Sequence, residues 1–206
     1  MIASPTSAAT IDRLVRLLDA ARRGGPKVPV AEGRALGRAE AFAVQEKLAE
    51  VHGPVGGFKV ACPSDAPIVI APIFETDLHA SDATIHVPAG EEAGIELEFA
   101  FRLLRPLPDP ASLDFAEKLR DAVELLPAIE IVRSRLSEPA LAGAELKMAD
   151  NQMNGALILG EPIVDWGAIS VERASGFLSA GDSVLLDGQA RVHGGNAFET
   201  LRRFAL

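Results

Sequence analysis

The sequence predicts an α+β fold, in which a small helical N-terminal part precedes a mixed, β-rich body. Apolar residues repeat at helical spacing over roughly the first fifty positions. From Val55 onward, short apolar runs alternate with glycine and proline, a pattern typical of strands separated by turns. The chain has 206 residues and is 48% hydrophobic, enough to bury a sizeable core. We therefore expect a helical part over residues 1–55 and the β-rich body over 56–206.

The helical part is expected to contain two helices. Thr10 is a good N-cap for the first, and Gly24-Gly25-Pro26 ends it. The second runs from about Gly37 to Val51 and stops before Gly53-Pro54. One further helix is predicted inside the body over residues 112–125, capped by its serine and closed by the proline at position 127.

The strands of the body are predicted from apolar runs bounded by turn residues. Asp187-Gly188 is a strong signal for a two-residue hairpin turn between the last two of these runs. The candidate strands are 57–61, 68–73, 84–87, 95–104, 128–132, 155–159, 183–186 and 190–192.

Charge and cysteine content exclude several classes of protein. The net charge is -9, from 29 acidic and 20 basic residues, which argues against electrostatic binding of nucleic acid. The single cysteine, Cys62, excludes an internal disulfide and a thiolate metal cluster. The N-terminus lacks the pattern of a signal peptide, and no stretch reaches the ~18 apolar residues of a membrane span. We expect a cytoplasmic protein with no nucleic-acid or membrane partner.

Three acidic residues in apolar strands carry the main chemical signal. Glu96 and Glu98 lie on one face of their predicted strand because side chains alternate along a strand. Glu130 lies in the next predicted strand, after the helix, and this connection allows the two strands to be neighbours in one sheet. Three carboxylates suit a hard divalent ion such as Mg²⁺ or Mn²⁺. The alternative is a solvated strand face with Ile95 and Leu97 in the core behind it.

Five segments together resemble one known family. In these positions the chain resembles the fumarylacetoacetate hydrolase superfamily, in the branch of the 2-oxopent-4-enoate (2-hydroxypentadienoate) hydratases and 4-oxalocrotonate decarboxylases. The most specific part is Glu-x-Glu followed by Pro-Ala-Ile-Glu. The resemblance implies that residues 56–206 form a catalytic body of the fumarylacetoacetate hydrolase C-terminal type. The segments are, in order, Phe42–Glu46, Gly57–Val60, Glu96–Phe101, Leu126–Arg135 and Ala149–Gly155.

The resemblance implies a function and a set of site residues. It implies a lyase of aromatic-compound catabolism, a hydro-lyase that adds water to a 2-hydroxy-dienoate or 2-oxo-alkenoate through a metal-stabilised enolate. The substrate is a small 2-oxo acid, the cofactor is Mg²⁺ or Mn²⁺, and the protein is a homo-oligomer. The implied metal ligands are Glu96, Glu98 and Glu130. The implied catalytic residues are Lys59 and Asp77, with Glu75 as a competitor for the second role. A partly buried lysine beside a cation has a lowered pKa, which suits proton transfer near neutrality.

Asn151 and Arg133 are the candidate substrate-binding residues, and each has a second interpretation. Asn151 belongs to the polar cluster Asp150-Asn151-x-x-Asn154-Gly155, which either orders the site or forms a turn. Arg133 replaces an acid that is usual in the family. It favours a substrate with a second carboxylate, and thus a 2-oxo-dicarboxylate decarboxylase, or it forms a surface salt bridge.

The end of the chain raises a third functional alternative. Family members normally continue with further strands where this chain stops at Leu206, so we expect the usual C-terminal strands to be missing. That departure keeps open a non-catalytic family member that binds a metabolite or a partner enzyme. Cleavage of a C–C bond in an acylpyruvate needs an added base, and no histidine is well placed for it.

Overall fold

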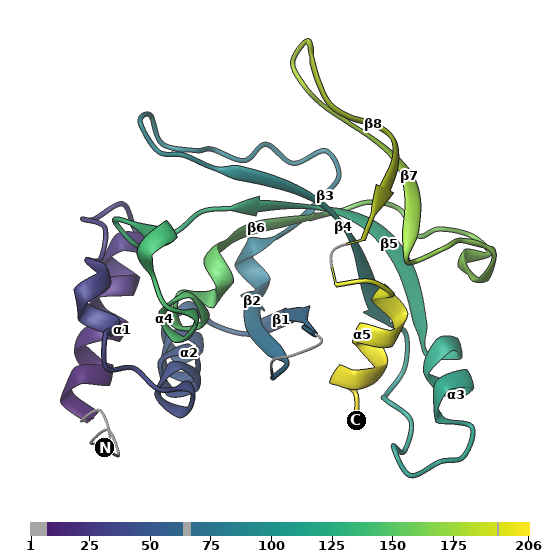
Figure 1. Ribbon diagram of the computed structural model, residues 1–206, viewed down its shortest axis with the longest axis horizontal. Coiled ribbons are helices and arrows are strands. Elements are labelled where there is room, and N and C mark those ends of the chain that lie inside the picture. The colour runs from purple at the N-terminus through teal and green to yellow at the C-terminus, as the bar shows by residue number, and fades with distance from the viewer. Residues whose placement is uncertain (1–7, 64–66, 193) are drawn as a thin grey trace.

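The computed structural model of the protein describes residues 8–63, 67–192 and 194–206 (Figure 1). Residues 1–7, on which part of the signal-peptide argument rests, lie outside these ranges. Helices α1 (Ala8–Arg22) and α2 (Arg38–His52) confirm the two predicted N-terminal helices. The first ends before Gly24, which has a φ of +89°, a backbone conformation that suits glycine.

The two N-terminal helices pack on each other through the apolar stripes that the sequence indicated. Leu14 and Leu18 of α1 lie in one buried cluster with Val44 and Leu48 of α2. Helix α4 (Ala144–Ala149), which the sequence did not predict, adds Leu146, Met148 and Ala149 to this cluster. The helical part is therefore fixed to the body through α4, because that helix leads directly into the strands of the main sheet.

The main sheet has four strands in the order β3-β6-β5-β4. They are β3 (Leu78–Ala80), β4 (Gly94–Leu103), β5 (Val123–Val132) and β6 (Asn154–Leu159). All pairs are antiparallel except β3 with β6. A separate antiparallel pair, β1 (Val55–Ala61) and β2 (Val69–Phe74), lies beneath this sheet, between the N-terminal helices and the C-terminal helix (Figure 1). The predicted α+β class is confirmed.

The C-terminal segment adds a hairpin and a helix. Strands β7 (Arg173–Ala180) and β8 (Ser183–Arg191) form the hairpin, which projects from the main sheet (Figure 1). Helices α3 (Phe115–Asp121) and α5 (Ala197–Phe204) lie at the end of the sheet away from the N-terminal helices. The short 3-10 helices are η1 (Val30–Gly33), η2 (Glu75–Asp77), η3 (Pro139–Leu141), η4 (Asn151–Met153) and η5 (Trp166–Ala168).

A second core cluster joins α3, α5 and the sheet. Phe115 and Leu119 of α3 are buried with Leu125 of β5 and Phe198 of α5. The Arg120 guanidinium lies 4.6 Å from the ring centroids of both Trp166 and Phe198, a cation–π arrangement that caps the cluster. Within the described part of the chain, no helix is both long and apolar enough to span a membrane.

Some of the predicted elements are wrong. The helix expected over 112–125 is shorter, because β5 already begins at Val123. Its residues 123–126 fit the apolar stripe of a helix, but they also fit a buried strand, and pairing with β4 decides in favour of the strand. The predicted strand 84–87 is not a strand in the structure. The short strand β3 was not predicted.

The expected hairpin turn is also misplaced. Asp187 and Gly188 lie inside β8, opposite Phe177 and Gly176 of β7, so the two predicted strands around them are one strand. The turn lies at Gly181-Asp182, where the φ of Gly181 is +56°. Both dipeptides carry turn signals, and the long register of β7 with β8 selects the earlier one.

Candidate metal centre

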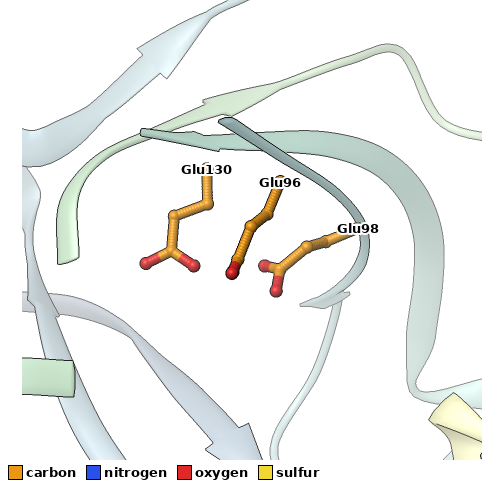
Figure 2. Close-up of side chains that lie close together, drawn as sticks. All are labelled: Glu96, Glu98 and Glu130. Atoms are coloured by element: carbon orange, nitrogen blue, oxygen red, sulfur yellow. The ribbon is translucent and has the colours of Figure 1, made fainter. Parts of the chain in front are cut away.

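The register of β4 on β5 brings the three predicted glutamates together. Glu96 is the cross-strand partner of Glu130, and Glu98 is the partner of Ala128 two residues along. Cross-strand partners share a face of the sheet, so all three carboxylates leave the sheet on the same side. One oxygen from each lies within 4.8 Å of the others. Figure 2 shows the three side chains ending in carboxylates that lie side by side.

These carboxylates are held at an electrostatic cost. Glu130 is 1% exposed, and burial raises the pKa of its carboxyl group. Burial, together with the negative charge of Glu130, also raises the pKa of Glu98 to about 7. Like charges directly opposite one another on a strand pair repel. The cluster therefore needs positive charge close by to remain fully ionised.

Lys59 of β1 supplies one such charge. Its ammonium donates to Glu130 Oε2 and, at 3.2 Å, to Glu96 Oε2. Burial lowers the pKa of Lys59, but the charge of Glu130 and the hydrogen bond to it outweigh burial, and the pKa is raised. The pKa is raised here because carboxylates surround the amine, whereas the lowered pKa expected from the sequence applies to a lysine beside a bound cation.

Asn154 holds Glu130 from the other side. Its amide donates to Glu130 Oε1 at 2.9 Å, and the asparagine is 1% exposed. Sequence reasoning placed Asn154 in a polar cluster without a role of its own. The register that puts it beside Glu130 includes a bulge, between Ile131 and Val132, that the sequence does not reveal.

The segment before Asn154 has an unusual backbone. Asn151, Gln152 and Met153 have φ values of +47°, +50° and +62°. Such left-handed conformations in non-glycine residues cost on the order of 1–3 kcal/mol each and occur often at functional sites. Asn151 is 2% exposed, and its Oδ1 has no hydrogen-bond partner within the described residues. The candidate Asn151 therefore lies buried in a strained turn that leads into β6.

Asp77 and Arg133 lie in other ion pairs. The carboxylate of Asp77 pairs with Arg22 of α1. Arg133 donates to Glu91 Oε2 at 2.8 Å, and Lys27 contacts the same oxygen at 3.3 Å. Among the described residues, neither side chain is bonded to Lys59 or to the three glutamates. The structure thus brings together the three glutamates and Lys59, and it places Asp77 and Arg133 in separate contacts.

The donor set fits a hard divalent cation. It consists only of carboxylate oxygens, the ligand type that Mg²⁺, Mn²⁺ and Ca²⁺ prefer. Three acids against one lysine leave an excess of negative charge, and burial together with this charge raises the pKa of Glu98. Glu96, Glu98 and Glu130 are the residues that would hold such an ion.

Comparison with known proteins identifies the fold. No protein-family model and no curated protein sequence matches the chain. The solved structure of 4-oxalocrotonate decarboxylase from Pseudomonas putida G7, complexed with calcium and acetate, has a TM-score of 0.68 over 97% of this chain and 80% of that one. The chain therefore shares the fold of this decarboxylase structure.

A second structure gives the same result. The same decarboxylase complexed with magnesium and adipate has a TM-score of 0.67, covering 98% of this chain and 81% of that one. The sequence identities are 14% and 13%, so the likeness lies in the fold. The fold class expected from the resemblance to the fumarylacetoacetate hydrolase superfamily is confirmed.

Proposed function

We propose that this chain is a divalent-metal-dependent lyase that acts on a small 2-oxo acid. The observation that carries the proposal is the convergence of Glu96, Glu98 and Glu130 within 4.8 Å, with Lys59 beside them. Support comes from the solved structures of the same fold, which are complexed with calcium or magnesium. We propose Mg²⁺ or Mn²⁺ as the ion in this chain.

The residues of the site would divide the chemistry between them. A divalent ion supplies Lewis-acid stabilisation of the negative charge that develops on the oxygen of a 2-oxo acid. Glu130 is fixed by Asn154, so it offers a preorganised oxygen. Lys59, which donates to Glu96 and Glu130, would bind the carboxylate of the substrate or hold the proton that the reaction moves. Asp77, with its partner Arg22, would reach the substrate only if their ion pair opened.

Hydration of a 2-oxo-alkenoate is the first candidate reaction. In it, water adds across the carbon–carbon double bond of the conjugated substrate, with hydroxide at the far carbon and a proton at its neighbour. The sequence resemblance supports this reaction through Glu-x-Glu and Gly-Phe-Lys-Val, which contain Glu96, Glu98 and Lys59.

Decarboxylation of a 2-oxo-dicarboxylate is the second candidate. The two solved structures with this fold are named 4-oxalocrotonate decarboxylase, which favours it. Of the two roles expected for Arg133, recognition of a second carboxylate or a salt bridge, the structure shows a salt bridge, with Glu91. The decarboxylase proposal therefore rests on the neighbours rather than on this arginine.

Calorimetric titration with Mg²⁺ and Mn²⁺ tests the metal site. The wild type is expected to bind, and Glu98→Ala is expected to lose binding. Glu117→Ala, which removes an exposed carboxylate on α3, is the matched control and should titrate like the wild type. A wild type that binds neither ion would contradict the proposed function.

Two assays on the same samples separate the reactions. Metal-dependent loss of the ultraviolet absorbance of 2-hydroxypenta-2,4-dienoate indicates the hydratase. Metal-dependent release of CO₂ from 4-oxalocrotonate indicates the decarboxylase. Metal binding with neither reaction would favour the remaining alternative, a non-catalytic protein that binds a metabolite or a partner enzyme.

A homo-oligomer is a further proposal. Ile95 and Leu97, on the face of β4 opposite the glutamates, are 43% and 39% exposed, and Phe177 on the hairpin is 62% exposed. The hairpin adjoins this face, because a Cβ added at Gly176 would lie 3.0 Å from Leu97. Burial of such side chains against a second copy would stabilise an assembly. Light scattering after size exclusion tests this, and a mass of 21.7 kDa would contradict it.

A further inference from the structure

The ammonium group of Lys59 lies among the three candidate metal ligands. It donates to Glu130 Oε2 and to Glu96 Oε2, so it bridges two of the three candidate ligands. The remaining oxygen of Glu130, Oε1, already accepts a hydrogen bond from Asn154. The two oxygens of Glu130 therefore have different partners: Oε1 accepts from Asn154, and Oε2 accepts from Lys59.

A divalent ion and the ammonium group cannot share this oxygen at low cost. Two cations at contact distance repel strongly, and the repulsion is greater where water is excluded. Glu130 is 1% exposed, so its oxygens lie in such a place. Binding of an ion through Glu130 Oε2 is therefore more favourable when the ammonium group of Lys59 moves away.

The side chain of Lys59 has space to move away from Glu130. The side chain of Glu96 is 51% exposed and that of Lys59 is 22% exposed, so the cluster is open on the Glu96 side. A lysine carries its charge on a flexible four-carbon stem, and the ammonium group can move by side-chain rotation alone. Strand β1 can keep its place beside β2 while the ammonium group leaves Glu130.

We propose that Lys59 is a displaceable internal counter-ion of the metal site. It neutralises Glu130 and Glu96 in the metal-free protein, and a divalent ion binds by expelling its ammonium group toward the open, Glu96 side. This inference rests on the proposed function. Metal loading and the release of Lys59 toward the substrate are then one event, so the lysine becomes free to bind a substrate carboxylate only in the loaded site.

The affinity for the metal alone tests the proposal. Lys59→Met keeps an unbranched stem and removes the charge, and Lys47→Met removes a lysine charge on α2 as the matched control. Calorimetry with Mn²⁺ should show tighter binding in Lys59→Met by roughly 5–150-fold, the usual range of coupling between two sites, and no change in Lys47→Met. Equal or weaker binding in Lys59→Met, with binding intact in the wild type, would overturn the proposal but leave the metal site standing. Loss of binding in both proteins would overturn the metal site and the proposal together.

A second variant tests the same proposal if Lys59→Met does not fold without metal. Lys59→Arg places a planar, two-pronged cation beside the same carboxylates, and such a group is harder to displace from a carboxylate. It is expected to bind Mn²⁺ more weakly than the wild type. Unchanged or tighter binding in Lys59→Arg would contradict displacement.

Discussion

The side-chain amide of Asn154 donates a hydrogen bond to Glu130 Oε1 at 2.9 Å, and both residues are 1% exposed. The other carboxylate oxygen of Glu130 accepts from Lys59. Glu130 is therefore held on both sides, by a neutral amide donor from β6 and by a charged ammonium donor from β1. If a divalent ion displaces the ammonium group, as proposed above, the contact from Asn154 is the one that remains.

Replacement of Asn154 should weaken metal binding. Asn154→Leu removes the hydrogen bond and leaves a buried carboxylate oxygen unsatisfied, so Glu130 loses its fixed orientation. Partners of metal ligands typically contribute about 10–100-fold to metal affinity, and calorimetry with Mg²⁺ should show a loss of this size. Gln189→Leu, at an exposed amide on β8, is the control. An affinity unchanged in Asn154→Leu would show that Glu130 needs no such support.

Glu98 should make the metal-free protein less stable at alkaline pH. Its pKa is raised from 4.5 to about 7, so the folded chain holds a proton that the unfolded chain releases. This contribution to stability is present below pH 4.5 and is lost as the pH rises through 7. Glu98→Gln cannot ionise. With a metal chelator present, the free energy of unfolding of Glu98→Gln should exceed that of the wild type, and this excess should be about 1–3 kcal/mol larger at pH 8 than at pH 5. Urea unfolding at both pH values measures this difference, and a difference independent of pH would contradict it.

The position of Glu96 and Glu98 on one face of their strand could be predicted from the sequence. Alternation along a strand is independent of the rest of the fold, so Glu96 and Glu98 had to share a face. The pairing of Glu96 with Glu130 depends on the register of β4 on β5. The spacing of the two motifs was compatible with that register but did not specify it, and the expectation that the three acids converge came from the resemblance to a known family.

The contacts of Lys59 and Asp77 could not be predicted in the same way. Lys59 reaches the glutamates from the separate β1–β2 pair, and sequence patterns do not specify how two sheets lie relative to each other. Asp77 meets Arg22, which lies 55 positions away in the N-terminal helix. Long-range ion pairs of this kind leave no periodic signal in the sequence, so the partner of Asp77 could not be predicted.

Asp150 should matter more for stability than an exposed acid. It accepts from Arg135 through both the side chain and the backbone N–H, and Arg135 also donates to the carbonyl of Asn154. Both charged side chains are buried, at 1% and 6% exposed. Loss of one partner of a buried pair typically costs 3–5 kcal/mol, so we expect about that loss in Asp150→Ala by urea unfolding. Asp114→Ala, which removes an exposed pair with Lys118, should cost much less. Similar losses in the two variants would contradict a structural role for Asp150.

His52, at the end of α2, should make the protein less stable at acidic pH. Burial, and next the charge of Arg22, lower its pKa from the ordinary value of 6.5. Its Nε2 lies 3.4 Å from Asp19 Oδ1 but has no hydrogen-bond partner within the described residues, and its ring centroid lies 5.1 Å from that of Phe74. The charge of Asp19, which would raise the pKa of His52, is outweighed by burial and by the charge of Arg22.

The sign of the effect of His52 follows from its lowered pKa. The unfolded chain takes up a proton near pH 6.5, whereas the folded chain resists protonation until the pH falls further. The stability that neutral His52 contributes is therefore complete above pH 6.5 and is lost as the pH falls below it. His52→Phe keeps an aromatic ring against Phe74 and cannot titrate, so its free energy of unfolding should fall less than that of the wild type between pH 7.5 and pH 5.5, values about one unit either side of the ordinary pKa. Denaturant unfolding of both proteins at the two pH values measures the difference. Parallel losses would mean that His52 is protonated equally easily in the folded and unfolded chains.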